Sequence, residues 1–199
     1  MGDSRMARKI VIIQVHPDPG GWHLCRGLAD AYASGAEAAG HAVRRIEIAS
    51  LNFPILRTQE DFESGHIPPG LDAAAADIAW ADHLVIVFPL WLGTQPALLK
   101  AFLEQVARPG VAFEYVKDGF PRQLWKGKSA RVVITMGMPA LVYRWWFGAH
   151  GLRALERNIL KFAGIKPVRE SLFGGVGQAS DIKRQEWLDT MRRYGGSGD

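Results

Sequence analysis

The sequence has little of several features that mark whole classes of protein. Its 199 residues include one cysteine, Cys25, so no disulfide can form within the chain. The apolar run at residues 10–15 is far too short to cross a bilayer. The charged residues 1–9 are not followed by an apolar stretch with a small-residue cleavage site. These absences exclude a disulfide-stapled miniprotein, predict no membrane span, and lead us to expect a cytoplasmic protein.

The chain also has only a small excess of charge of one sign. The chain has 24 Lys and Arg against 20 Asp and Glu, a formal net charge of +4, and no long run of like charge. We therefore expect no nucleic-acid groove, although a weak positive field favours the approach of anionic ligands. The six histidines show no ligand spacing such as His-x-x-x-His, so the sequence predicts no metal site.

What the chain does have is the composition of one globular domain, with 48% hydrophobic and 22% charged residues. Short β-branched apolar runs alternate with helical patterns, which predicts an α/β fold with a parallel sheet and helices on both faces. We expect a single domain over residues 9–195 and a loosely ordered segment at 1–8. The predicted strands are 9–16, 41–48, 83–90, 130–136 and 168–173, and the predicted helices are 22–39, 71–81, 96–106, 152–163 and 181–194.

Two long segments, residues 51–70 and 108–128, are rich in Gly and Pro and show no clear period. Loops of this length in a compact domain are often lids or interfaces.

Ligands of such sheets bind beyond the carboxyl ends of the strands, which directs attention to three loops. In the first, residues 16–23, Gly20 and Gly21 allow the backbone to approach a ligand, and the following helix N-terminus favours a phosphate. The loop matches neither Gly-x-Gly-x-x-Gly nor a Walker motif. A simple strand-to-helix turn is the alternative.

The second loop, residues 88–96, places Trp91, Leu92 and Gly93 at the exit of a strand. A flat redox-active heterocycle needs an apolar wall and backbone N–H donors, and such a loop can supply both. Alternatively, Trp91 only covers the edge of the sheet.

The third loop runs from Thr135 to Tyr143, and His150 follows. Tyr and His side chains can donate hydrogen bonds to, or exchange protons with, a ring that gains negative charge on reduction. A structural role is the alternative for each. The cluster at residues 145–147 indicates buried or interfacial surface, and Cys25 is expected to be an inert buried thiol.

Together these segments resemble the NAD(P)H:quinone oxidoreductase family of flavodoxin-like proteins, which also includes potassium-efflux ancillary oxidoreductases and modulators of drug activity. The resemblance runs over residues 9–175, and its most specific part is Phe-Pro-Leu-Trp at 88–91 followed by Pro-Ala-Leu-Leu-Lys at 96–100. It implies a three-layer sandwich with a five-stranded parallel sheet in the order 2-1-3-4-5. It also implies a homodimer with non-covalent FAD or FMN, reduced by NAD(P)H and reoxidised by a quinone in a ping-pong cycle.

The resemblance also implies roles for individual residues. Those of the flavin site fall into four groups: His16, Trp22 and His23 at the phosphate and ribityl end; Pro89, Leu90, Trp91, Leu92 and Gly93 at the ring edge; Thr135, Gly137 and Met138 at the pyrimidine side; and Tyr143 with His150 as the catalytic pair. Phe113 and Tyr115 match aromatic positions that face the substrate from the partner subunit.

The chain departs from the family pattern in three places. Gly20 and Gly21 stand where a Ser or Thr hydroxyl is usual, and Leu92–Gly93 replace a bulkier aromatic pair. The spacing from Tyr143 to His150 is one residue longer. These departures favour an alternative function, a non-catalytic or weakly active regulatory subunit that shares the fold and the dimer interface. A one-electron carrier is disfavoured because such carriers are usually strongly acidic.

Overall fold

A computed structural model describes residues 6–63 and 66–199 of the chain. Most of the segment expected to be loosely ordered, residues 1–5, lies outside the described residues. Arg8 is anchored, since its guanidinium donates to the Gly198 carbonyl at 2.6 Å and to the Ser129 hydroxyl at 2.7 Å.

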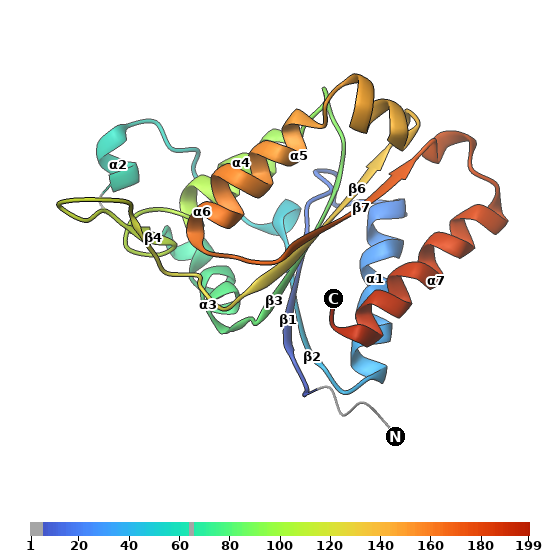
Figure 1. Ribbon diagram of the computed structural model, residues 1–199, viewed down its shortest axis with the longest axis horizontal. Coiled ribbons are helices and arrows are strands. Elements are labelled where there is room, and N and C mark those ends of the chain that lie inside the picture. Colours follow the sequence, from blue (N-terminus) through green and yellow to red (C-terminus); the bar gives the residue numbers. More distant parts are fainter. Residues whose placement is uncertain (1–5, 64–65) are drawn as a thin grey trace.

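The centre of the molecule is a five-stranded parallel sheet in the order β2-β1-β3-β6-β7 (Figure 1). Counted within the sheet alone, this is the predicted order 2-1-3-4-5, so the flavodoxin-like arrangement is confirmed. The inner strands are buried on both faces, which explains their continuous β-branched composition, and the exposed strand β2 lies at an edge. The bounds are β1 Lys9–Gln14, β2 Ala42–Glu47, β3 His83–Pro89, β6 Ser129–Met136 and β7 Val168–Gly174.

Helices cover both faces of the sheet, as predicted. Alternate residues of the strands pack in opposite directions: Ile10 and Ile12 belong to the core shared with α1 and α7, and Val11 and Ile13 to the core under α3, α4 and the α5–α6 segment. The bounds are α1 Leu24–Ala38, α3 Asp72–Trp80, α4 Ala97–Val106, α5 His150–Ala154, α6 Lys161–Ala163 and α7 Asp181–Ser197. Ser180 caps α7, since its hydroxyl accepts from the Lys183 N–H at 3.2 Å.

The two segments without a clear period contain short elements. The first holds a 3-10 turn at Ile48–Ser50, the helix α2 at Gln59–Glu63 and a 3-10 turn at Pro69–Leu71. The second folds into an antiparallel hairpin of β4, Phe113–Glu114, and β5, Arg122–Gln123. Propensity did not indicate this hairpin because each strand has only two residues.

The segment between α5 and α6, Leu155–Leu160, is a π-helix, and a second π turn spans Val142–Trp146. The helical segment ends at Gly164, which takes the left-handed conformation expected of a helix stop (φ 107°). A 3-10 turn at Val176–Gln178 leads into α7. In the described part of the chain, no helix has both the length and the apolarity needed to cross a membrane.

Candidate functional site

The three loops singled out in the sequence meet at the carboxyl edge of the sheet. The His16 ring lies edge-on to Trp91 with centroids 6.5 Å apart, which joins the first loop to the second. The Tyr143 hydroxyl donates to the Gly93 carbonyl at 3.5 Å, which joins the third loop to the second. The fold therefore gathers the three predicted loops at one edge, as the strand order requires.

The first loop is framed by two histidines. His16 follows β1 and His23 is the N-cap residue of α1, so the chain between them turns back and stacks their rings, with centroids 3.6 Å apart and planes 12° apart. Burial, and next the neighbouring His23, lower the pKa of His16. Gly21 makes the turn with a left-handed backbone (φ 74°), and Trp22 is 67% exposed.

The second loop is a tight turn with an apolar tip. The backbones of Trp91 and Thr94 pair through two hydrogen bonds, Trp91 N–H to Thr94 O at 2.9 Å and Thr94 N–H to Trp91 O at 3.0 Å. Leu92 and Gly93 at the tip both have positive φ, 48° and 79°. For a leucine this conformation costs on the order of 1 kcal/mol. Pro89 and Leu90 are half-buried beneath the turn, whereas Leu92 is fully exposed.

The third loop begins at the end of β6. Thr135 is buried, and its hydroxyl lies 3.2 Å from the Cys25 thiol, so this side chain packs against α1. Cys25 is buried, as predicted, and burial raises its pKa to about 11, which disfavours the reactive thiolate. Gly137 is exposed with open space where a side chain would stand, and Met138 is half-buried.

The predicted catalytic pair lies at the far end of this loop. Tyr143 is buried, and its hydroxyl accepts a hydrogen bond from the Leu152 N–H at 3.2 Å while it donates to Gly93. Burial raises the pKa of Tyr143. His150 is exposed at the start of α5, after Ala149 in a left-handed conformation (φ 48°). Tyr143 thus ties the third loop to the second loop and to α5, whereas His150 faces solvent.

Phe113 and Tyr115 are not part of this edge. They stack edge-on with centroids 5.3 Å apart, and Phe113 also packs against Phe162 at 4.9 Å. Phe162 lies in α6, at the opposite end of the α5–α6 segment from His150. The hairpin lies on the opposite side of the molecule from the ends of β6 and β7 (Figure 1). Phe113 and Tyr115 of one chain therefore do not reach the loops of that same chain.

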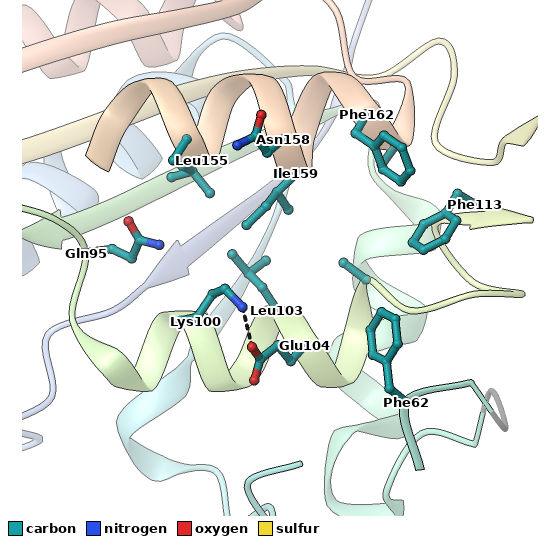
Figure 2. A pocket seen from close by; sticks show the side chains of 13 residues that line it. Phe62, Gln95, Lys100, Leu103, Glu104, Phe113, Leu155, Asn158, Ile159 and Phe162 are labelled. Atoms are coloured by element: carbon teal, nitrogen blue, oxygen red, sulfur yellow. Dashed lines mark hydrogen bonds and ion pairs between the residues drawn. The ribbon is translucent and has the colours of Figure 1, made fainter. Parts of the chain in front are cut away.

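Beside the hairpin, a mainly apolar cavity of about 370 Å³ lies between α4 and the α5–α6 segment. Figure 2 shows aromatic rings of Phe62, Phe113 and Phe162 at one end and the Lys100–Glu104 ion pair along its floor. The cavity opens to solvent between α4 and the α5–α6 segment.

Sequence reasoning missed two residues of the edge. Asp18 lies in the first loop and contacts Gly20 and His23. The sequence Pro-Asp-Pro-Gly-Gly at residues 17–21 is a strong turn signal, and it could have indicated that Asp18 binds the loop backbone. Gly151 packs so closely on the second loop that a Cβ would lie 2.6 Å from Thr94 Cα. No local pattern reveals such a contact.

The aromatic cluster at residues 145–147 is exposed in this chain, with Trp145 at 77% and Trp146 at 84%. Its burial within one chain is therefore a wrong prediction, and its role as an interface stays a prediction. Within residues 6–63 and 66–199, no three His, Cys, Asp or Glu side chains are grouped so as to hold a metal ion.

Comparison with known proteins gives matches over most of the chain. The model of a family described as having a flavodoxin-like fold matches residues 8–194. An uncharacterized NAD(P)H oxidoreductase of Haemophilus influenzae is 29% identical over 147 residues, 72% of each chain. An FMN-dependent NADH:quinone oxidoreductase of Hahella chejuensis is 37% identical over 98 residues, 49% of this chain but only 45% of that relative.

Among solved structures, an NAD(P)H:quinone oxidoreductase from Methanothermobacter marburgensis superimposes with a TM-score of 0.80 at 24% identity. The superposition covers 96% of this chain and 97% of the other. At this identity the likeness concerns the fold.

Proposed function

The chain belongs to the flavodoxin-like fold family, and from this premise we propose that it is an FMN-dependent NAD(P)H oxidoreductase that reduces a quinone-like acceptor. The resemblance to NAD(P)H:quinone oxidoreductases is confirmed by the family match and the similar proteins. The observation that carries the proposal is the convergence of the stacked histidines, the Trp91 turn and the Tyr143 loop at one edge of the sheet.

The residues at this edge fit a flavin. A flavin has an anionic tail and a flat, largely apolar ring, and here imidazoles and a glycine turn at the start of α1 stand beside exposed Trp91 and Leu92. Gly93 and Gly137 have open space where side chains would otherwise stand, so a ring can approach their backbones. The first loop would hold the tail, and the second and third would hold the ring.

A bound flavin supplies the hydride chemistry, and the protein supplies binding, orientation and electrostatics. Trp91 and Leu92, both exposed in this chain, would form an apolar wall that orients the ring and excludes water from one side. Backbone N–H groups of the second and third loops would donate to oxygens and nitrogens that gain negative charge. His150, exposed beside these loops, can hold or move a proton at an imidazole nitrogen.

The proposal includes a homodimer. The β4–β5 hairpin, which begins at Phe113, lies on the opposite side of the molecule from the ends of β6 and β7 (Figure 1), which supports a role for Phe113 and Tyr115 at the edge of a partner chain. The open apolar cavity between α4 and the α5–α6 segment is the surface on which such a partner would pack. A ping-pong cycle is part of the proposal, because the NAD(P)H donor and the quinone-like acceptor would have to occupy the same site in turn.

The test is the visible absorption spectrum of purified protein mixed with FMN or with FAD, before and after NADH or NADPH under anaerobic conditions. Bound flavin that bleaches with either donor and recovers with a quinone is the expected result. Flavin that binds without bleaching would make the donor assignment wrong. If no flavin binds, the result contradicts the proposed function and favours the alternative, a non-catalytic or weakly active regulatory subunit.

A matched pair of variants ties this test to the site. Trp91→Ala is expected to weaken flavin binding because it removes the apolar wall. Trp80→Ala is the control, because Trp80 ends α3 at the amino edge of the sheet and stacks with Arg44, 4.1 Å away. Equal losses in both variants would argue that flavin binds elsewhere.

A further inference from the structure

In the first loop, the carboxylate of Asp18 binds the same groups that a flavin phosphate would use. One oxygen of Asp18, Oδ1, accepts from the Gly20 N–H at 2.8 Å. The other, Oδ2, lies 3.0 Å from Nε2 of His23. The carboxylate is thus held by a loop amide and an imidazole of the stacked pair.

The hydrogen-bond geometry assigns the donor on His23. Its Nε2 atom faces Asp18 Oδ2 at 3.0 Å and the Gly20 carbonyl at 2.8 Å, and both of these are acceptors. Nε2 therefore carries a proton, which it shares between them. The Gly20 amide, and next the His23 side chain, lower the pKa of Asp18, so the side chain is an anion at neutral pH.

Asp18 is the negative group that the first loop places before α1. The first turn of the helix has no acidic residue, and the N-cap residue His23 makes no side-chain cap. Arg26 in the same turn lies 3.6 Å from Glu47 of β2, so its charge is already partly matched. A helix N-terminus favours an anion, and here the loop supplies one.

We propose that Asp18 is an internal counter-ion that the flavin phosphate displaces, so that this one side chain sets the affinity for phosphorylated flavins. The inference rests on the proposed function. A phosphate seated on the Gly20 amide and the His23 imidazole cannot share them with a second anion a few ångströms away. Asp18 has room to leave, because its side chain is 58% exposed.

The consequence is a difference between two ligands that share one ring system. FMN carries the phosphate and riboflavin does not, so only FMN must displace Asp18. Removing the charge with Asp18→Asn is expected to tighten FMN binding about tenfold, the size of one like-charge repulsion at a partly solvated site. Riboflavin binding is expected to stay within about twofold.

The experiment measures dissociation constants of FMN and riboflavin by quenching of flavin fluorescence on the purified apoprotein. Asp18→Glu keeps the charge and is expected not to tighten FMN binding. Asp30→Asn is the matched control, because Asp30 is an exposed carboxylate on α1, the helix that follows the first loop, and it pairs with Arg45 instead. It is expected to change neither constant.

The outcomes separate this inference from the proposed function. If Asp18→Asn leaves FMN binding unchanged or weakens it, or if it shifts both flavins equally, Asp18 only shapes the loop and the inference is wrong. If the wild-type protein binds neither flavin, the proposed function itself fails, whatever Asp18 does.

Discussion

At the scale of single residues, the environment of a side chain decides what it can do, and Tyr143 illustrates this. Its hydroxyl is buried and engaged with the backbones of Leu152 and Gly93. Such a group holds loops in place, and any effect on the reaction passes through that positioning. His150, exposed nearby, is the member of the pair that is free to meet a ligand.

Tyr143→Phe is therefore expected to act on both stability and turnover. It leaves the buried Leu152 N–H without its acceptor, which should cost about 1–3 kcal/mol in the free energy of unfolding. Reduction of bound flavin by NAD(P)H should slow by at least about tenfold, with flavin content unchanged. Urea unfolding and anaerobic stopped-flow absorption measure the two effects.

Tyr194→Phe is the control for that variant, since its ring keeps its contact with Arg131, 3.7 Å away, outside the candidate site. His150→Ala is expected to slow flavin reduction without loss of stability, because the side chain is exposed. Unchanged reduction rates in both Tyr143→Phe and His150→Ala would remove the catalytic role from the pair.

Side-chain orientation was the hardest feature to predict at this scale. The sequence placed Thr135 at the end of a strand, which is correct, and the family pattern assigned it to a flavin ring. The structure turns its hydroxyl to the Cys25 thiol, a partner 110 positions away in the chain. Periodicity indicates which face of a strand is buried, but it does not indicate which polar atom will lie opposite.

At the scale of elements, the inner strands β1, β3 and β6 were predictable because burial on both faces demands uninterrupted β-branched runs. The helices were predictable from their apolar stripes and stops, such as Ser180 before α7 and Gly164 after α6. The β4–β5 hairpin and the π turns were not, because they are set by tertiary contacts. The strand order predicted where the loops of the site lie, but the sequence did not predict how these loops pack against one another.

That packing leads to a prediction for Gly151. A Cβ there would lie 2.6 Å from Thr94 Cα and 2.7 Å from the Gly93 carbonyl, both backbone atoms with little freedom to move. Gly151→Ala should force α5 away from the Trp91 turn and lower the free energy of unfolding by about 1–3 kcal/mol. Flavin affinity should fall with it, since two walls of the site separate.

Gly177→Ala is the matched control, because nothing lies within 4 Å of its added methyl and its φ is not positive. Thermal unfolding and flavin titration of the two variants provide the comparison. A Gly151→Ala protein as stable as the Gly177→Ala protein would show that α5 and the Trp91 turn are not in close contact.

At the scale of the whole molecule, the proposed dimer can be tested at the cavity between α4 and the α5–α6 segment. Ile159 lines this cavity and is half-buried, so Ile159→Asp places a charge on the surface where a partner would pack. We expect the wild-type protein to sediment as a dimer and the variant as a monomer. Ile182→Asp, at an exposed position of α7 on the other face of the sheet, should remain dimeric.

At the amino edge of the sheet, a buried histidine makes the stability of the whole fold depend on pH. His83 is fully buried there, with Nδ1 2.7 Å from the Ser129 hydroxyl, and Nε2 has no hydrogen-bond partner among the described residues. Burial, and next the charges of Arg8 and Arg131, lower the pKa of His83 to about 3. The folded protein therefore holds this imidazole neutral at a pH where the unfolded chain protonates it.

Between about pH 6.5 and pH 3, the unfolded state thus binds more protons than the folded state at this residue. The contribution to stability is complete above the unfolded pKa and is lost as the pH falls through that range. The free energy of unfolding should drop by on the order of 2 kcal/mol between pH 7 and pH 5. Urea unfolding at several pH values measures it. His83→Asn should flatten the dependence, whereas His66→Asn, at an exposed histidine, should leave it steep. An equally steep dependence in His83→Asn would assign the acid sensitivity of the fold to other groups.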